Sequence, residues 1–129
     1  MKYLVSLFLV MLAVGCTEPT PEEKAAQAAL SYYNRLLEGY PDGLLAAKAN
    51  VDELPSDYRA ELVKVYRQYV EDMRTKHQGL HGVSLSENAP RRDTAQHLTY
   101  VFLLLSYNDS TREEIVVPMV ERDGEWLLR

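Results

Sequence analysis

Three histidines and a single cysteine are the side chains of this 129-residue chain best suited to catalysis or metal binding. His77 and His81 lie four residues apart, a spacing that can hold a metal ion when both side chains share one helix face. Gly79 and Gly82 interrupt any helix at this point, and no nearby carboxylate completes a set of ligands. We therefore expect both histidines at a helix end or in a turn, and we predict neither a metal site nor a cofactor.

His97 lies at the start of a long strand-like segment, where it could serve as the general base of a pocket. Some of the nine tyrosines could line the same pocket, so the possible pocket residues are Tyr32, Tyr69, His97 and Tyr100. The alternative is that these tyrosines fill gaps between helices and sheet while their hydroxyl groups reach water. A general base also needs a bound substrate within hydrogen-bond reach, and no residue pattern here indicates one. We therefore predict no catalytic residue.

Cys16 is the only cysteine, and the segment before it has the composition of a secretory signal. Lys2 is followed by a largely apolar run over residues 3–14, which is shorter than the roughly 20 residues of a membrane span. The stretch LAVGC that ends at Cys16 resembles the lipobox of bacterial lipoproteins. This resemblance implies that residues 1–15 are removed as a lipoprotein signal peptide and that Cys16 is lipidated. The alternative is a general signal peptide followed by a free thiol, which is a liability in an oxidising envelope.

Residues 16–23 follow as an acidic tether, with two prolines, three glutamates and no apolar side chain after the cysteine. The lipobox resemblance implies attachment to the bacterial cell envelope through the N-terminal lipid. We expect the outer membrane, on its periplasmic or surface side. The whole chain carries 14 basic and 19 acidic residues and a formal charge of −5, which disfavours nucleic acid or an anionic membrane surface as the main partner.

Helical periodicity begins near residue 22 and continues to Gly39, with Thr20 as the expected N-cap of this first helix. A short helix is expected over residues 44–50, and a longer one from Pro55 to near Gly79. One face of the long helix is predicted to carry five apolar side chains, namely Tyr58, Leu62, Val65, Tyr69 and Met73.

The periodicity changes from helical to alternating after Gly79. Strands are expected over residues 83–86, 94–107, 111–121 and 125–129, with residues 91–93 at a loop tip and Asp123-Gly124 in a tight hairpin turn. Helices followed by an antiparallel meander predict one α+β domain over residues 24–129. In this domain the N-terminal helices pack on one face of a curved four-stranded antiparallel sheet.

The middle of this sheet carries apolar side chains on both faces. Residues 100–105 contain only apolar or aromatic side chains, and residues 115–120 are also apolar throughout. An antiparallel sheet with one wet face should instead alternate between apolar and polar residues. We therefore expect the second face to be covered, either by a sheet that curls on itself or by a second copy of the protein.

Two stretches of the chain resemble a known superfamily. They are ALSYY (29–33) with LLEG (36–39) in the first helix, and VVPMVER (116–122) with DGEW (123–126) at the closing hairpin. These stretches and the element order resemble the nuclear-transport-factor-2-like (cystatin-like) superfamily. More narrowly, they resemble small bacterial lipoproteins with a lumazine-binding-like or DUF4878-type domain. The resemblance implies a cone-shaped α+β domain, and because the superfamily contains both enzymes and binding modules, it does not decide the function.

We therefore predict a membrane-anchored envelope lipoprotein whose domain is a non-catalytic binding module. Its partner would be a protein, including a second copy in a homodimer, or a small apolar ligand. The alternative is a pocket enzyme of the isomerase or hydrolase type that uses His97 and the pocket tyrosines.

Overall fold

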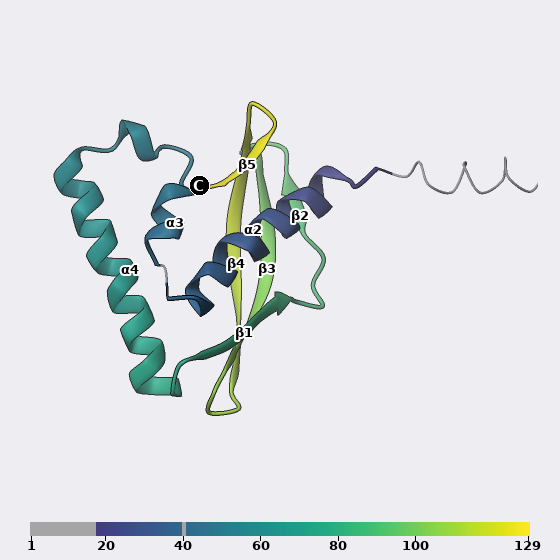
Figure 1. The fold of residues 1–129 in the computed structure, drawn as a ribbon. Coiled ribbons are helices and arrows are strands. Elements are labelled where there is room, and N and C mark those ends of the chain that lie inside the picture. Colours follow the sequence, from purple (N-terminus) through teal and green to yellow (C-terminus); the bar gives the residue numbers. More distant parts are fainter. Residues whose placement is uncertain (1–17, 40) are drawn as a thin grey trace, which may run out of the picture.

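The computed structural model describes residues 18–39 and 41–129, and it consists of helices followed by an antiparallel sheet (Figure 1). The helical elements are α2 (Pro21–Leu37), α3 (Asp42–Ala46), the short 3-10 helix η1 (Val51–Glu53) and α4 (Ser56–His77). The strands are β1 (Leu80–Leu85), β2 (Arg91–Asp93), β3 (Leu98–Tyr107), β4 (Arg112–Arg122) and β5 (Glu125–Leu128). This arrangement confirms the predicted α+β class. The predicted signal peptide (1–15) and the lipidation site Cys16 lie outside the described residues.

α2 begins with the predicted cap. The Thr20 hydroxyl accepts a hydrogen bond from the backbone N–H of Glu23 at 3.2 Å. Pro21 occupies the first turn, where a backbone N–H has no partner within the helix, so proline loses no hydrogen bond there. The helix therefore begins inside the range 16–23 that was predicted as a tether. Residues 18–20 of that range are not helical, whereas residues 21–23 form the first turn of α2.

The short helix lies earlier than the predicted residues 44–50, because the chain after α3 pairs with the last strand. The N–H of Ala49 donates to the carbonyl of Leu128 at 2.7 Å, and the N–H of Leu128 donates to the carbonyl of Ala47 at 2.9 Å. These bonds hold residues 47–49 in a bridge beside β5, so the helix ends at Ala46.

The sheet follows the predicted meander, with the order β1-β3-β4-β5. The hairpin turn at Asp123-Gly124 has φ values of 52° and 80°, the left-handed pair that a tight two-residue hairpin requires. β2 is a short additional strand that pairs with residues 98–100 of β3, while β1 pairs with residues 103–107 along the same edge. The four-stranded prediction is therefore confirmed for the main strands, with β2 extending the β1 edge.

The predicted start of the long strand at residue 94 is wrong, and so is the loop tip at residues 91–93. Residues 94–97 form the turn between β2 and β3, and His97 has a φ of 54°. The Asp93 carboxylate accepts hydrogen bonds from the N–H groups of Ala95 and Gln96 at 3.1 and 3.2 Å, which stabilises this turn.

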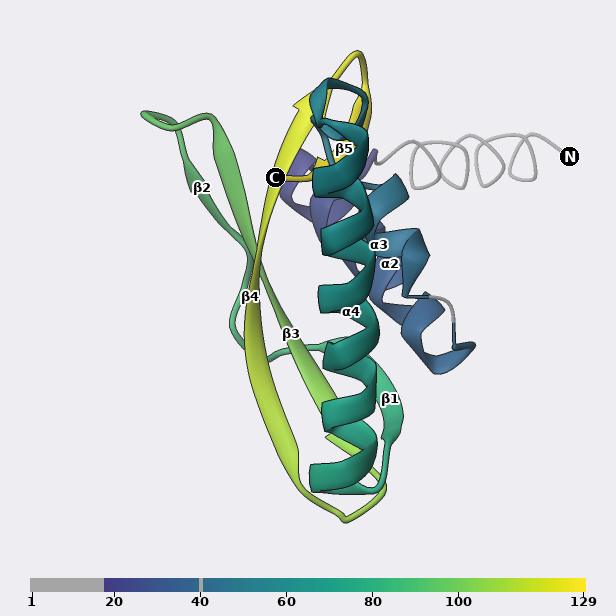
Figure 2. The same ribbon diagram turned by 90° about the vertical axis from the view of Figure 1, so that its left-hand side faces the viewer.

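The helices all lie on one side of the sheet (Figure 2). We call this side the inner face and the opposite side the outer face. α2 packs closely on the inner face because Ala25 and Ala29, both fully buried, allow its backbone to approach the sheet. Their partners include the fully buried Leu103 and Met119 on the two central strands.

α4 differs from its predicted amphipathic pattern. Tyr58 and Val65 are 50% and 58% exposed, so the predicted apolar face does not face the protein over its whole length. Met73 and Tyr69, in the second half of the helix, do pack against the sheet and α3. The first half stands beside α3 and away from the sheet (Figure 1). Among the described residues, no helix combines the length and the apolarity that a membrane span requires.

Candidate functional site

The structure does not bring the four predicted pocket residues together. Tyr32 lies on α2 and donates its hydroxyl hydrogen to the backbone carbonyl of Trp126. Tyr69 lies on α4, within the helix–sheet core. Tyr100 is on the outer face, where the Arg91 guanidinium lies 5.6 Å from its ring centre. Tyr69 lines a hollow of about 170 Å³, and His97, which is exposed in the β2–β3 turn, lines a separate and larger one.

This hollow, which we call the mouth hollow, has a volume of about 450 Å³. It opens at the end of the sheet formed by the β2–β3 turn and the β4–β5 hairpin. Its lining residues are Arg92, Thr94, His97, Leu98, Thr99, Glu121 and Trp126. Strand register pairs Arg92 with Thr99 and Glu121 with Trp126, and paired residues share one face of a sheet. These four side chains therefore belong to the inner face.

The mouth hollow combines an aromatic wall, a buried hydroxyl and two opposite charges. Thr99 is only 2% exposed, although it carries a hydroxyl group. Arg92 and Glu121 lie on β2 and β4, the two strands that flank β3, and Glu121 is two residues along β4 from the partner of Thr99, so their backbones are about 12 Å apart. A ligand placed between them can meet a cation at one end, an anion at the other and the Trp126 ring alongside.

Sequence reasoning found His97 but missed the other polar residues of this hollow. Glu121 and Trp126 could have been paired from the Asp123-Gly124 turn, because a two-residue hairpin fixes the register of the strands beside it. Arg92 gave no such signal, since a three-residue strand shows no measurable alternation of apolar and polar residues.

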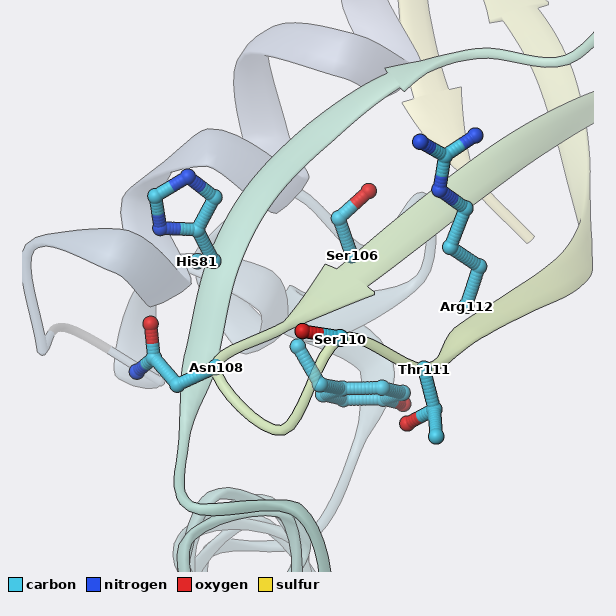
Figure 3. A pocket seen from close by; sticks show the side chains of 7 residues that line it. His81, Ser106, Asn108, Ser110, Thr111 and Arg112 are labelled. Carbon is cyan, nitrogen blue, oxygen red and sulfur yellow. The ribbon is translucent and has the colours of Figure 1, made fainter.

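A second hollow, of about 440 Å³, lies at the opposite end of the sheet around the β3–β4 turn (Figure 3). Figure 3 shows His81 on β1 and Arg112 on β4, with Ser106 between them. The Asn108 side chain in the turn donates to the carbonyl of Gln78 at 3.0 Å, so its amide nitrogen already has a partner. This hollow is polar, and it lies at the end of the sheet farther from the start of α2.

His77 lies at the end of α4, as predicted, whereas the predicted helix end or turn is wrong for His81, which lies in strand β1. His77 Nδ1 lies 3.0 Å from the carboxylate of Asp109 and 3.2 Å from the hydroxyl of Thr111. Its ring stacks on Tyr107 with ring centres 4.3 Å apart. The N–H of Asp109 also donates to the His77 carbonyl at 3.1 Å. We call this set of contacts the α4 lock, because it attaches the end of α4 to the β3–β4 turn.

The Asp109 carboxylate is held in its charged form by the α4 lock. A hydrogen bond from the Thr111 hydroxyl is the main cause that lowers the pKa of Asp109, and the Thr111 N–H and His77 add to this effect. Among the described residues, no group of three His, Cys, Asp or Glu side chains is placed to hold a metal ion.

Four tyrosines lie where the helices meet the half of the sheet that ends in the β3–β4 turn. They are Tyr33, Tyr66, Tyr69 and Tyr107, which we call the tyrosine cluster. Burial, together with neighbouring tyrosine hydroxyls, raises the pKa of Tyr33 and Tyr69 to about 12. Burial and the nearby Glu113 raise the pKa of Tyr107 to about 12. These tyrosines pack between α2, α4 and the sheet, and Tyr69 and Tyr107 also line the hollow of about 170 Å³.

No protein-family model matches the chain, and no curated protein matches it either. A solved structure from Campylobacter jejuni, provisionally named an NTF2-like transpeptidase, is similar to it with a TM-score of 0.61 and 13% sequence identity. The similarity covers 79% of this chain and 94% of that one. At this level of identity the similarity concerns the fold alone. Together with helices packed on a curved antiparallel sheet, it shows that this chain has the nuclear-transport-factor-2-like fold.

Proposed function

We propose that this chain is a lipid-anchored protein of the bacterial envelope whose domain binds a small ligand without transforming it. The lipobox-like stretch ending at Cys16 supports the anchor, and the same stretch supports a place among small lipoproteins with lumazine-binding-like or DUF4878-type domains. The outer membrane is the proposed site of attachment. The acidic tether would then hold the domain close to the membrane surface.

The mouth hollow is the observation that carries the binding proposal. Its volume of about 450 Å³ lies within the range of roughly 300–1,000 Å³ that is usual for small-molecule sites. Deeper along the inner face, the space is filled by fully buried side chains such as Leu103 and Met119, so the ligand occupies the open end. The lining favours a small molecule with a flat apolar part and polar or charged ends.

The chain contains one tryptophan, and this residue lines the mouth hollow, so its fluorescence reports occupancy directly. The probe is anilinonaphthalene sulfonate, an aromatic anion that can contact both Trp126 and Arg92. We expect saturable energy transfer from Trp126 to the probe. Arg92→Ala should weaken this binding about tenfold, because a hydrogen bond to a charged group contributes about 1.5 kcal/mol.

Arg91→Ala is the matched control. Arg91 is the neighbour of Arg92 in β2, but its side chain lies over Tyr100 on the outer face. We expect this variant to bind the probe as the native chain does. Equal effects of the two substitutions, or a larger effect of Arg91→Ala, would contradict a ligand site in the mouth hollow.

The alternative function is a pocket enzyme, and one observation favours it, since His97 and Glu121 line the same hollow. However, His97 and Glu121 form no ion pair within residues 18–39 and 41–129. Turnover of an apolar test substrate by the native chain, lost in His97→Ala and kept in His81→Ala, would replace the binding proposal with this enzymatic one.

A further inference from the structure

We infer that the hollow around the β3–β4 turn binds a phosphate group. We call it the turn hollow, and its lining residues are His81, Ser106, Tyr107, Asn108, Ser110, Thr111 and Arg112. The inference goes beyond the proposed function, because the turn hollow and the mouth hollow lie at opposite ends of the sheet and share no residue.

The turn hollow is basic, although the chain as a whole is acidic. None of its seven lining residues carries a carboxylate, whereas the whole chain has a formal charge of −5. Arg112 supplies a permanent positive charge, and hydroxyl groups, an amide and an imidazole lie around it. A guanidinium binds a phosphate group through two parallel hydrogen bonds, so this set of groups is suited to that anion.

Two carboxylates that are close to Arg112 in the chain have other partners. The Glu114 carboxylate accepts hydrogen bonds from the Asn88 side chain at 2.8 Å and from the Ser86 hydroxyl at 3.2 Å. The Asp109 carboxylate belongs to the α4 lock. Within residues 18–39 and 41–129, Arg112 forms no ion pair, so its charge is available to a ligand.

Strand register directs polar side chains of three strands towards one space. Gly82 on β1 and Arg112 on β4 both pair with Ser106 on β3, and paired residues share one face of a sheet, here the outer face. The register shifts between Leu80 and Gly82, so His81 lies in a β-bulge, a feature that re-aims a side chain. Figure 3 shows the side chains of His81, Ser106 and Arg112 pointing in the same direction from these three neighbouring strands.

Gly82 leaves the space above Ser106 open. No atom lies within 4 Å of the position that a Cβ would take at Gly82. The backbones of Gly82 and Arg112 are about 10 Å apart, because each strand lies next to β3. Donors from three strands surround this space, an arrangement that suits the three terminal oxygens of a phosphate ester better than the two oxygens of a flat carboxylate.

The β3–β4 turn is held in place by its own hydrogen bonds. The N–H of Asn108 donates to the carbonyl of Gly79 at 2.9 Å, and the Asn108 side chain donates to the carbonyl of Gln78 at 3.0 Å. The N–H of Tyr107 donates to the carbonyl of Thr111 at 2.9 Å. A site that is ordered before its ligand arrives loses less conformational freedom on binding, which favours affinity.

The test is a titration of inorganic phosphate with the full chain, purified in a detergent that contains no phosphorus. Phosphorus NMR at constant ionic strength should show saturable broadening of the phosphate signal. Arg112→Ala should weaken binding about tenfold, because it removes hydrogen bonds between two charged groups. Ser106→Ala should weaken binding about fivefold, because it removes a hydrogen bond from a neutral hydroxyl.

Arg91→Ala and Ser84→Ala are the matched controls. Arg91 lies on the same face near the other end of the sheet, and Ser84 lies on β1, where it pairs with Leu104. We expect both controls to bind phosphate as the native chain does, and all variants to unfold cooperatively on heating. Equal weakening by Arg91→Ala and Arg112→Ala, or a phosphate signal that the native chain leaves sharp, would overturn the inference.

Competition identifies the source of the phosphate group. Glycerol 3-phosphate and a short-chain phosphatidate carry the same group without and with acyl chains, and each should displace inorganic phosphate from the native chain. Equal displacement would assign a soluble phosphate ester to the turn hollow, and stronger displacement by the phosphatidate would assign a lipid headgroup. Displacement by neither compound would overturn the inference.

Discussion

Arg91 and Arg92 are adjacent in the chain, yet their side chains lie on opposite faces of the sheet. Arg92 lines the mouth hollow, while the guanidinium of Arg91 covers Tyr100 on the outer face. This division follows from the two-residue period of a strand, and it gives the mouth hollow a control residue one position away. Thr99 and Tyr100 on the paired strand β3 are divided in the same way.

At the residue scale, Asp109 should make the stability of the fold depend on pH in the acidic range. Its pKa in the folded chain is lowered, so its charged form stabilises the fold above the ordinary aspartate pKa, and this contribution disappears as the pH falls through the folded value. We expect Asp109→Asn to unfold a few degrees below the native chain at pH 7. The two melting temperatures should converge in strong acid, when followed by circular dichroism.

Asp123→Asn provides the control for this prediction. Asp123 occupies the other tight hairpin turn, with a φ of 52°, which asparagine also tolerates. We expect its melting temperature to follow that of the native chain at every pH. A constant difference between Asp109→Asn and the native chain from neutral to acidic pH would show that the α4 lock stabilises through contacts other than the Asp109 charge.

At the scale of elements, the sequence predicted those that have strong local signals. α2 begins at Thr20 and Pro21, and α4 ends at Gln78 and Gly79, both of which have positive φ. The turn between β4 and β5 is formed by Asp123-Gly124. Each of these signals depends on a few adjacent residues, so it can be read without knowledge of the fold.

The elements that sequence reasoning misplaced depend on distant partners. β2 exists because it pairs with the start of β3, and α3 ends early because residues 47–49 pair with Leu128. The mouth hollow was missed for the same reason, since Arg92 and Glu121 meet there only because β2 and β4 both pair with β3. The burial pattern of α4 was misjudged because the first half of the helix lies away from the sheet, which leaves Tyr58 and Val65 exposed.

The tyrosine cluster should make the contact between helices and sheet sensitive to alkali. Because the folded pKa of Tyr33 is raised to about 12, its stabilising effect is complete below the ordinary tyrosine pKa near 10. That effect is lost as the pH rises from about 10 towards 12. We expect unfolding in this range, monitored by Trp126 emission, and Tyr33→Phe should shift the transition to higher pH because phenylalanine cannot ionise.

Tyr58→Phe is the matched substitution for this experiment. Tyr58 is 50% exposed near the start of α4, so removal of its hydroxyl group should leave the alkaline transition at the same pH as in the native chain. An identical shift for both variants would show that alkaline unfolding does not depend on the buried tyrosines.

At the scale of the whole molecule, the start of the described chain and the mouth hollow lie at the same end. Ala25, near the start of α2, packs in the same cluster as Val101 and Met119, whereas Leu36 near its end packs with Leu105 and Tyr107. Figure 1 shows the same direction of α2 across the sheet. Anchoring through Cys16 would therefore place the mouth hollow on the membrane side of the domain and leave the outer face free along its length.

Native mass spectrometry of the chain, extracted gently from its own membranes, tests the lipid anchor and the ligand site in one measurement. We expect a polypeptide that begins at Cys16 and carries covalent acyl groups. We also expect a non-covalent small molecule that is retained by the native chain and by Arg91→Ala and is lost from Arg92→Ala. An unacylated chain would contradict the anchor, and a small molecule retained equally by both arginine variants would contradict a ligand site in the mouth hollow.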